Sequence, residues 1–249
     1  GGCLWQHLTE DFQVSQKLSI LKELLAPWSD HLPDIHMVPS PQSWNYRNRI
    51  QGYVSEGQFC FREDRSHQMV PIEQCLIAEP EINEQLMARG FHDMNVESRL
   101  QLSSKGAVST AETDRNPFEF AQVNRTMNEL LVQSVLKHAE QVPFQSYLDL
   151  YAGSGNFAFA ISERFPQKTG LAVELNAESV KMARHELKSR KWSPKRLKLM
   201  CGSVAHCLRR LSLSRESLII IDPPRAGLGT EARRKLSQTS VAGMLYISC

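Results

Sequence analysis

The sequence predicts an α/β protein, in which a Rossmann-like domain with a parallel sheet follows a smaller, mainly antiparallel β domain (α+β). Two observations support this fold class. After residue 118, five apolar runs alternate with helical stretches, and this order produces a parallel sheet with right-handed crossovers. Before it, short runs separated by Gly, Ser and charged residues are typical of antiparallel strands. The predicted domains are residues 1–117 and 118–249.

The first domain opens with a predicted helix over residues 11–26, where apolar residues recur at helical spacing until Pro27 ends the pattern. We expect this helix to pack on the second domain. Strands are expected within 46–55, 57–64 and 67–76, then a helix over 81–89 and strands over 96–102 and 107–110.

The second domain is expected to open with a helix that Asn124 introduces. Five strands are then expected at 146–151, 169–175, 197–201, 217–222 and 243–248. The intervening helices are expected at 156–165, 178–190, 203–211 and 230–240. In such sheets, a ligand binds at the carboxyl ends of the strands.

Composition excludes several classes of protein. No apolar stretch approaches the length that crosses a bilayer, and no charged-then-apolar leader stands at the N-terminus. The six cysteines are scattered through 249 residues, which is not a disulfide framework. We therefore expect a cytoplasmic protein that makes no membrane contact.

The net charge of +2 conceals an asymmetry between the two predicted domains. Residues 1–117 carry 10 Lys+Arg against 16 Asp+Glu, and residues 118–249 carry 19 against 11. The densest basic run is Lys181–Lys198. It is either a solvated helix face or an electrostatic footprint for phosphates, and both can hold at once.

A glycine-rich turn follows the first predicted parallel strand and holds Asp149, Gly153 and Gly155. Glycines let the backbone approach a ligand closely at the N-terminus of the next helix. Glu174 ends the next strand, where a carboxylate can accept hydrogen bonds from both ribose hydroxyls. The turn also fits Gly-x-Gly-x-x-Gly/Ala through Ala158, so by itself it does not separate a nicotinamide cofactor from S-adenosylmethionine or from a turn without ligand.

The fourth strand ends on Asp222, and Pro223 and Pro224 stiffen the backbone after it. Such a turn offers a rigid platform for an edge-on base and resembles those of methyltransferases that act on nucleobases, which favours S-adenosylmethionine. Cys249 follows the apolar run 244–247. A cysteine there is either a small buried hydrophobe or a nucleophile at the edge of a site.

With these motifs together, the chain resembles the RNA uracil-5 methyltransferases, which form 5-methyluridine. The matching stretches follow the family's order over essentially the whole chain: "GGCLWQHL", "YRNRIQG", "EQCLIAEPEIN", "FEFAQVN", "LDLYAGSGNF", "VELN", "IDPPRAGL" and "YISC". The resemblance implies that Asp222 lies beside the cofactor and the target base, and that Cys249 is the nucleophile. Together with the turn, it implies a set of cofactor-binding residues: Gln122, Asp149, Tyr151, Gly153, Gly155, Asn156, Glu174, Ser203 and Asp222.

The resemblance also implies the chemistry of Cys249. C5 of uracil is too weak a nucleophile to take a methyl group unaided. A thiolate that adds to C6 converts the ring to an enolate, whose C5 attacks the sulfonium methyl. A base then removes the C5 proton and the thiolate leaves.

Cys3 and Cys75 match two ligands of the four-cysteine [4Fe-4S] cluster in one branch of the family, that of 23S rRNA (uracil-5-)-methyltransferase. We therefore expect the two residues to lie within a few ångströms of each other. The family has further cysteine ligands upstream and, past the nucleophile, two more strands and a glutamate base. The sequence is thus expected to be the central portion of a longer protein and to be inactive by itself.

The expected partner is RNA, with ribosomal RNA favoured and transfer RNA possible, bound by a monomer. Tyr46, Arg47 and Arg49 are candidates for phosphate and base contacts or are simply basic residues on an exposed strand. Because the target base has to leave its stack, a flipped loop nucleotide is expected. Two other classes stay open, a nicotinamide oxidoreductase and a non-catalytic RNA-binding or RNA-folding module.

Overall fold

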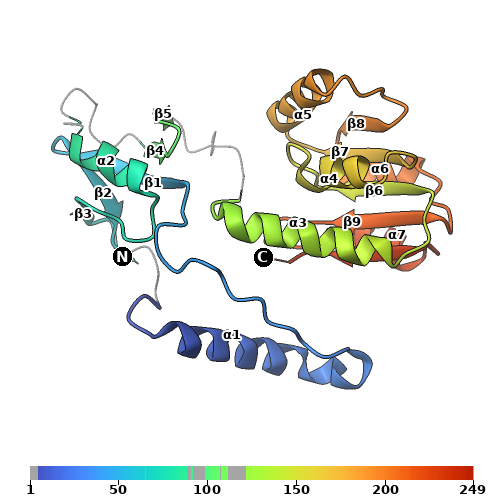
Figure 1. The fold of residues 1–249 in the computed structure, drawn as a ribbon, viewed down its shortest axis with the longest axis horizontal. Helices are drawn as coiled ribbons and strands as arrows, with labels where there is room; N and C mark the ends of the chain where they lie inside the picture. Colours follow the sequence, from blue (N-terminus) through green and yellow to red (C-terminus); the bar gives the residue numbers. More distant parts are fainter. Residues whose placement is uncertain are drawn as a thin grey trace. The chain divides into compact units, whose positions relative to one another are not determined.

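The computed structural model describes residues 5–64, 66–88, 91, 99–106, 108–111 and 122–248 (Figure 1). Contacts divide the chain into two units, Gly1–Phe118 with Gln122–Asn128, and Glu119–Ala121 with Glu129–Cys249. The predicted domain boundary at residue 117 lies outside the described residues and stays a prediction.

The first unit begins with α1 (Glu10–Leu25), which continues into a short 3₁₀ helix, η1 (Ala26–His31). The helix ends where it was predicted to end, since Pro27 lies in the first turn of η1. No residue of α1 is buried. Its predicted packing on the second domain stays a prediction.

A five-stranded antiparallel sheet with the order β3-β2-β1-β4-β5 forms the core of the first unit. Ile50 and Val54 alternate with half-buried residues along β1, as expected for a strand with one buried face. They pack against α2 and β4 in one apolar cluster. The elements are β1 (Arg49–Ser55), β2 (Gln58–Arg62), β3 (Met69–Pro71), α2 (Pro80–Ala88), β4 (Arg99–Ser103) and β5 (Val108–Ala111).

The helix α3 (Arg125–Glu140) begins in the first unit and continues into the second. Its start is fixed by Asn124, whose Oδ1 accepts a hydrogen bond from the Met127 N–H at 2.9 Å. This is the side-chain cap that the sequence predicted.

The second unit is a five-stranded sheet in which every pair is parallel, with the order β10-β9-β6-β7-β8. Counted from β6, this order is 3-2-1-4-5, and the direction of winding reverses between β6 and β9. The confirmed strands are β6 (Ser146–Leu150), β7 (Thr169–Glu174), β8 (Leu197–Cys201), β9 (Ser217–Ile221) and β10 (Gly243–Tyr246). The predicted α/β class with a smaller antiparallel sheet is thereby confirmed.

Helices cover both faces of the parallel sheet (Figure 1). One apolar core holds residues of α3, α4 (Asn156–Arg164) and α5 (Ala177–Ser189). A second core holds residues of α6 (Val204–Arg210) and α7 (Thr230–Ser237). The five residues of β9 are all buried, which explains why its sequence is uniformly apolar apart from Ser217. Among the described helices, none is both long enough and apolar enough to cross a membrane.

Candidate active site at the strand ends

The turn between β6 and α4 uses its two glycines for different reasons. Gly155, at φ +101°, is the N-cap of α4, and a Cβ there would lie 2.5 Å from the ring of Phe159. Gly153, at φ +56°, faces open space, and a Cβ there would meet nothing within 4 Å. Gly155 is therefore required by packing, whereas Gly153 leaves room for a group from outside the protein.

Tyr151 lies in the same turn and also has a left-handed backbone, at φ +64°. A residue with a Cβ pays about 1–2 kcal/mol for this conformation. Burial raises the pKa of its hydroxyl, and the neighbouring Tyr246, at the end of β10, raises it further. Left-handed residues other than glycine cluster at functional sites, where the surrounding structure holds them in place.

Glu174 joins the turn to the next strand end. Its Oε2 accepts a hydrogen bond from the Gly153 N–H at 2.9 Å, and its Oε1 accepts one from the Asn176 N–H at 2.7 Å. The backbone oxygen of Glu174 also accepts a bond from the Gly202 N–H at 2.8 Å, just after β8. One residue thus ties together the loops that follow three adjacent strands.

Asp149 is fully buried on the central strand β6, with an exposed fraction of 0%. Neither of its carboxylate oxygens has a described partner in normal hydrogen-bond geometry, although the Ala158 backbone N–H lies close enough to lower the pKa of the carboxyl. Burial raises the pKa of this carboxyl to about 8, and the negative charges of Asp222 and Glu174 add to the effect. Because buried polar atoms are normally paired, this carboxyl requires a donor from a ligand or from water, or its own proton.

Asp222 follows β9, and its N–H donates to the Leu150 oxygen at 3.3 Å. It is half-buried, and burial raises the pKa of its carboxyl. The predicted rigid turn follows it: Pro223 is buried, and the Gly227 N–H donates to the Pro224 oxygen at 2.7 Å. The structure therefore brings Asp222 close enough to Asp149 for their charges to interact.

Two more predicted cofactor residues stand at helix starts on the same edge of the sheet. Asn156 is the first residue of α4, directly after the glycine turn. Ser203 caps α6, where its Oγ accepts a hydrogen bond from the His206 N–H at 3.3 Å. A cap role is sufficient to explain Ser203, so its cofactor role stays a prediction.

Gln122 belongs to the first unit. Its backbone oxygen accepts a hydrogen bond from the Asn48 side chain at 3.1 Å. Its predicted contact with the cofactor stays a prediction. The predicted nucleophile Cys249 and the predicted cluster ligand Cys3 lie outside the described residues.

The three candidate RNA contacts lie together at the start of β1, and all are half-buried. Tyr46 packs against the apolar core of the first unit. The Arg47 backbone pairs with the segment before α2, and its side-chain Nε is buried without a hydrogen-bond partner among the described residues. Arg49 lies on the half-buried face of β1. Each of the three residues has contacts within the fold, and their contacts with RNA stay predictions.

Cys75 is buried at 6% exposure within the apolar core of the first unit. Its backbone is fixed by Asn83, which accepts from the Cys75 N–H at 2.8 Å and donates to its oxygen at 3.1 Å. Within the described part of the chain, no group of three His, Cys, Asp or Glu side chains is placed to hold a metal ion. The described residues therefore do not supply a ligand set for the expected cluster. The expected short distance between Cys75 and Cys3 stays a prediction.

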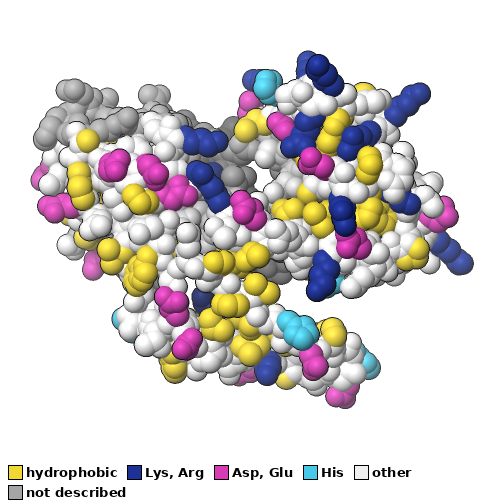
Figure 2. Space-filling view, viewed as in Figure 1, with side chains coloured by type: hydrophobic (Ala, Val, Ile, Leu, Met, Phe, Trp, Pro, Cys, Tyr) yellow, Lys and Arg dark blue, Asp and Glu magenta, His cyan; other side chains and the backbone are white. Residues whose placement is uncertain are grey.

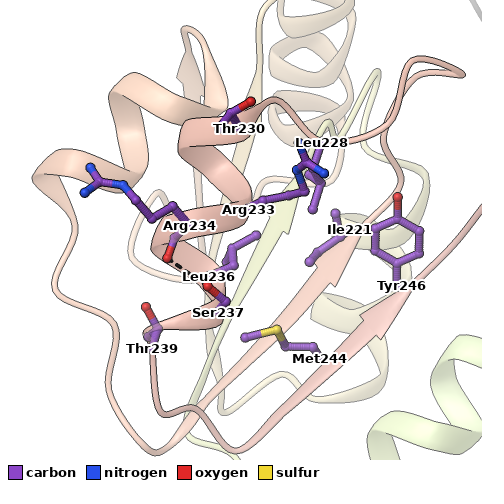
Figure 3. Close-up of a pocket in the computed structure, with 10 residues that line it drawn as sticks. All are labelled: Ile221, Leu228, Thr230, Arg233, Arg234, Leu236, Ser237, Thr239, Met244 and Tyr246. Carbon is purple, nitrogen blue, oxygen red and sulfur yellow. Dashed lines mark hydrogen bonds between the residues drawn. The ribbon is translucent and has the colours of Figure 1, made fainter. Parts of the chain in front are cut away.

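A hollow of about 680 Å³ lies between α7 and β10 (Figure 3). Arg233 and Tyr246 extend into it from the helix and from the strand, whereas Arg234 points away. None of its lining residues is a predicted cofactor or catalytic residue. Tyr246 is the residue that sequence reasoning missed: it adjoins Tyr151, and its place three residues before the predicted nucleophile was the available signal.

These features define a class of protein. A doubly wound sheet with a glycine turn after its first strand, a carboxylate at the end of its second and an Asp-Pro-Pro turn at its fourth is the Rossmann-like fold of S-adenosylmethionine-dependent methyltransferases. Among solved structures, the chain is similar to a putative methyltransferase of Escherichia coli, with 16% identity over 56% of this chain and 70% of that one and a TM-score of 0.38.

Comparison with known proteins shows which proteins the chain resembles. Residues 91–201 match the family model described as tRNA (uracil-5-)-methyltransferase. The chain is 33% identical to an uncharacterized RNA methyltransferase of Bdellovibrio bacteriovorus, and the match covers all of this chain and 65% of that protein. It is 27% identical to the tRNA (uracil(54)-C(5))-methyltransferase of Schizosaccharomyces pombe, over all of this chain and 55% of that protein. The chain is thus similar in sequence to the RNA (uracil-5-)-methyltransferases.

A third relative is the tRNA/tmRNA (uracil-C(5))-methyltransferase of Nautilia profundicola, which is 31% identical over 52% of this chain and 36% of that protein. The chain spans about two thirds or less of the length of these relatives, with 65% for the Bdellovibrio protein. The resemblance that eight short motifs predicted is thereby confirmed at the level of the family.

Proposed function

We propose that the protein transfers a methyl group from S-adenosylmethionine to C5 of a uridine in RNA. The observation that carries the proposal is the pairing of Gly153 with Glu174: the turn leaves open space, and a fixed carboxylate borders it. In this fold the carboxylate at the second strand end accepts the ribose hydroxyls of a nucleoside. Asp149 adds a buried acceptor without a described partner in normal hydrogen-bond geometry.

The proposed roles of the chain's own residues follow from this arrangement. S-adenosylmethionine, when bound, supplies a methyl group on a sulfonium. Gly153 gives the ligand its approach, Glu174 orients the ribose, and Tyr151, Asn156, Ser203 and Gln122 are proposed to line the remaining surface. Asp222 is proposed to stand between the cofactor and the base, and its raised pKa lets it be protonated closer to neutral pH than a solvent-exposed aspartate.

Cys249 is proposed to add its thiolate to C6 of the uracil, so that the C5=C6 electron pair moves into an enolate. C5 then attacks the methyl group, and the C–S bond of the sulfonium breaks with its electrons on sulfur. A base removes the C5 proton, the C5=C6 bond re-forms and the thiolate leaves. The base is proposed to be supplied by the full-length protein.

The target RNA is a finer proposal. Cys3 and Cys75 match the branch of the family that modifies ribosomal RNA, and we propose ribosomal RNA as the target on that basis. The alternative is transfer RNA, which the family description and the names of two relatives mention. Nucleoside analysis of both RNA pools from cells that lack the protein separates them, because only the target loses 5-methyluridine. An iron–sulfur cluster has no step in this proposal.

Isothermal titration tests the cofactor half of the proposal. We expect S-adenosylmethionine to bind and the nicotinamide dinucleotides not to bind. Binding of a nicotinamide dinucleotide in its place would support an oxidoreductase, which the glycine turn alone had left open.

A further inference from the structure

The structure points to an RNA-binding surface on the second unit that lies away from the candidate active site. We propose that five cations of α5 and of the loop and strand that follow it contact the phosphates of the RNA substrate, several nucleotides from the target uridine. This inference rests on the proposed function and adds a surface to it. We call it the α5 basic surface: Arg184, Lys188, Lys191, Lys195 and Lys198.

All five side chains are exposed, and none has an ion-pair partner among the described residues. The only acid within residues 181–198 is Glu186, and it is bonded to Arg190 at 2.5 Å. Figure 2 shows Lys and Arg side chains gathered over α5 and the loop after it. Unpaired cations on one surface are the electrostatic signature of a polyanion site.

The sequence keeps these charges at a cost to stability. Arg184 and Lys188 are four residues apart on α5, and like charges at this spacing destabilise a helix. Lys191 has φ +55°, a left-handed conformation at the end of the helix where glycine is preferred. A lysine at this position gives up the conformational advantage of glycine and places a charge on the surface instead.

The loop that carries Lys191 and Lys195 is held by a stack of aromatic and guanidinium groups. The Arg196 guanidinium lies 3.7 Å from the centre of the Trp192 ring and donates to the Ser162 oxygen at 2.6 Å. The Arg190 guanidinium lies 5.0 Å from the centre of the same ring and forms ion pairs with Glu163 and Glu186. These two arginines interact with other groups of the protein and hold the loop in place. The lysines on the loop therefore have a fixed backbone.

The surface extends toward the end of the sheet opposite to the candidate active site. The Gly170 N–H donates to the Arg196 oxygen at 2.9 Å, and Gly170 lies at the start of β7, whereas Glu174 ends that strand. The 13 residues of α5 connect the two ends, and a helix of this length spans about 20 Å. A phosphate bound here therefore belongs to nucleotides outside the reacting uridine.

The test is the salt dependence of RNA binding by the full-length protein, with bulk rRNA and bulk tRNA as probes. In the variant Lys188→Gln/Lys191→Gln/Lys195→Gln/Lys198→Gln, we expect affinity to fall about tenfold or more. The slope of log affinity against log salt should shrink by about 3, since each lost phosphate contact removes about 0.7–0.9. The dissociation constant for S-adenosylmethionine should not change.

The charge-matched control is Lys137→Gln/Arg210→Gln/Arg234→Gln/Lys235→Gln, which removes four cations of the same unit outside the surface. Equal losses in both variants would mean that only net charge matters and would overturn the proposal, as would an unchanged slope in the first variant. If the unsubstituted protein binds RNA and methylates it while the first variant does so equally well, this inference alone fails. If the unsubstituted protein binds no RNA, the proposed function fails and this inference fails with it.

The single variant Lys191→Gly separates binding from folding. It relieves the left-handed strain, so we expect the urea midpoint of unfolding to stay level or to rise. RNA affinity should fall, and the slope of log affinity against log salt should shrink by about 0.7–0.9, the value of one phosphate contact. Unchanged RNA affinity together with higher stability would show that Lys191 has no part in binding.

Discussion

The two ends of one parallel sheet carry opposite chemistry. At the carboxyl ends, Asp149, Glu174 and Asp222 form an acidic group whose charges interact, and the backbone there is left-handed at Tyr151. Toward the amino ends, α5 leads to the exposed lysines of the α5 basic surface. Because all strands point the same way, the amino ends of the strands lie at one end of the sheet and the carboxyl ends at the other. The proposed cofactor site and the proposed RNA-binding surface are thus separated by the length of one helix.

The largest expected effect concerns the nucleophile that we propose for the acidic end. Cys249→Ser in the full-length protein should lower methyl transfer about a thousandfold or more, because a catalytic nucleophile is lost. It should also abolish the denaturation-resistant adduct with RNA that contains 5-fluorouridine, whose C5 carries no proton to remove. Gel electrophoresis under denaturing conditions measures the adduct.

The control for this variant is S-adenosylmethionine binding, which should stay unchanged because the nucleophile is not a cofactor residue. An adduct that persists in Cys249→Ser would mean that a different side chain attacks C6.

The next prediction compares the effects on stability of substituting the two glycines of the turn. Gly155→Ala should lower the free energy of unfolding by about 2–4 kcal/mol, since its Cβ would lie 2.5 Å from the Phe159 ring in a left-handed backbone. Gly153→Ala, with nothing within 4 Å, should cost only about 1 kcal/mol of stability. Urea denaturation measures both.

Titration with S-adenosylmethionine tests the second difference between the two glycines. Gly153→Ala should weaken S-adenosylmethionine binding more than its small effect on stability suggests, because the new methyl group occupies the open space. Equal stability losses in the two variants would contradict the difference that the structure assigns to these glycines.

A smaller effect is expected at Glu174. Glu174→Ala should weaken S-adenosylmethionine binding by about 1–3 kcal/mol, since it removes an acceptor for ligand hydroxyls and leaves the Gly153 and Asn176 N–H groups without their partner. The matched control is Glu178→Ala, an exposed acid in the first turn of α5. If calorimetry gives the same dissociation constant for Glu174→Ala and the unsubstituted protein, the ribose assignment is wrong.

The last effect is a pH dependence of stability, spread over several pH units. The pKa of Asp149 is raised to about 8 in the folded protein, against about 4 in an unfolded chain. Between these values the folded state binds the extra proton, so stability falls as pH rises from about 4 to about 8. The slope from this group is at most about 1.4 kcal/mol per pH unit.

Asp149→Asn removes the titrating group, so its stability should depend less on pH in that window. Denaturation series at several pH values compare the two proteins. A stability that rises across this window in the unsubstituted protein, with no change of slope in Asp149→Asn, would contradict the raised pKa.

The parallel sheet was predictable almost to the residue because each strand is a short apolar run between helical stretches, and the central strands β6 and β9 are buried along nearly their whole length. β8 begins and ends where its sequence indicated, and β9 is apolar and buried along its length apart from Ser217. The antiparallel sheet was predicted less sharply: β3 spans only Met69–Pro71 within an expected run of ten residues. Short strands with one exposed face carry a weaker pattern, so their ends depend on pairing that the sequence does not show.

The site was predictable in its members but not in their roles. Sequence treated Gly153 and Gly155 alike, whereas only three-dimensional packing against Phe159 separates them. It gave no sign that Tyr151 is left-handed or that both carboxylate oxygens of Asp149 lack described partners in normal hydrogen-bond geometry. These properties depend on neighbours from other strands, which no local pattern encodes.

The most direct test of the central claim is nucleoside analysis of RNA after incubation with the full-length protein and S-adenosylmethionine labelled on its methyl group. The account predicts that the label appears in 5-methyluridine, at one position of one RNA, and that Asp222→Ala lowers its yield. Label on another base or on ribose, or an RNA that stays unlabelled while S-adenosylmethionine is bound, would contradict it.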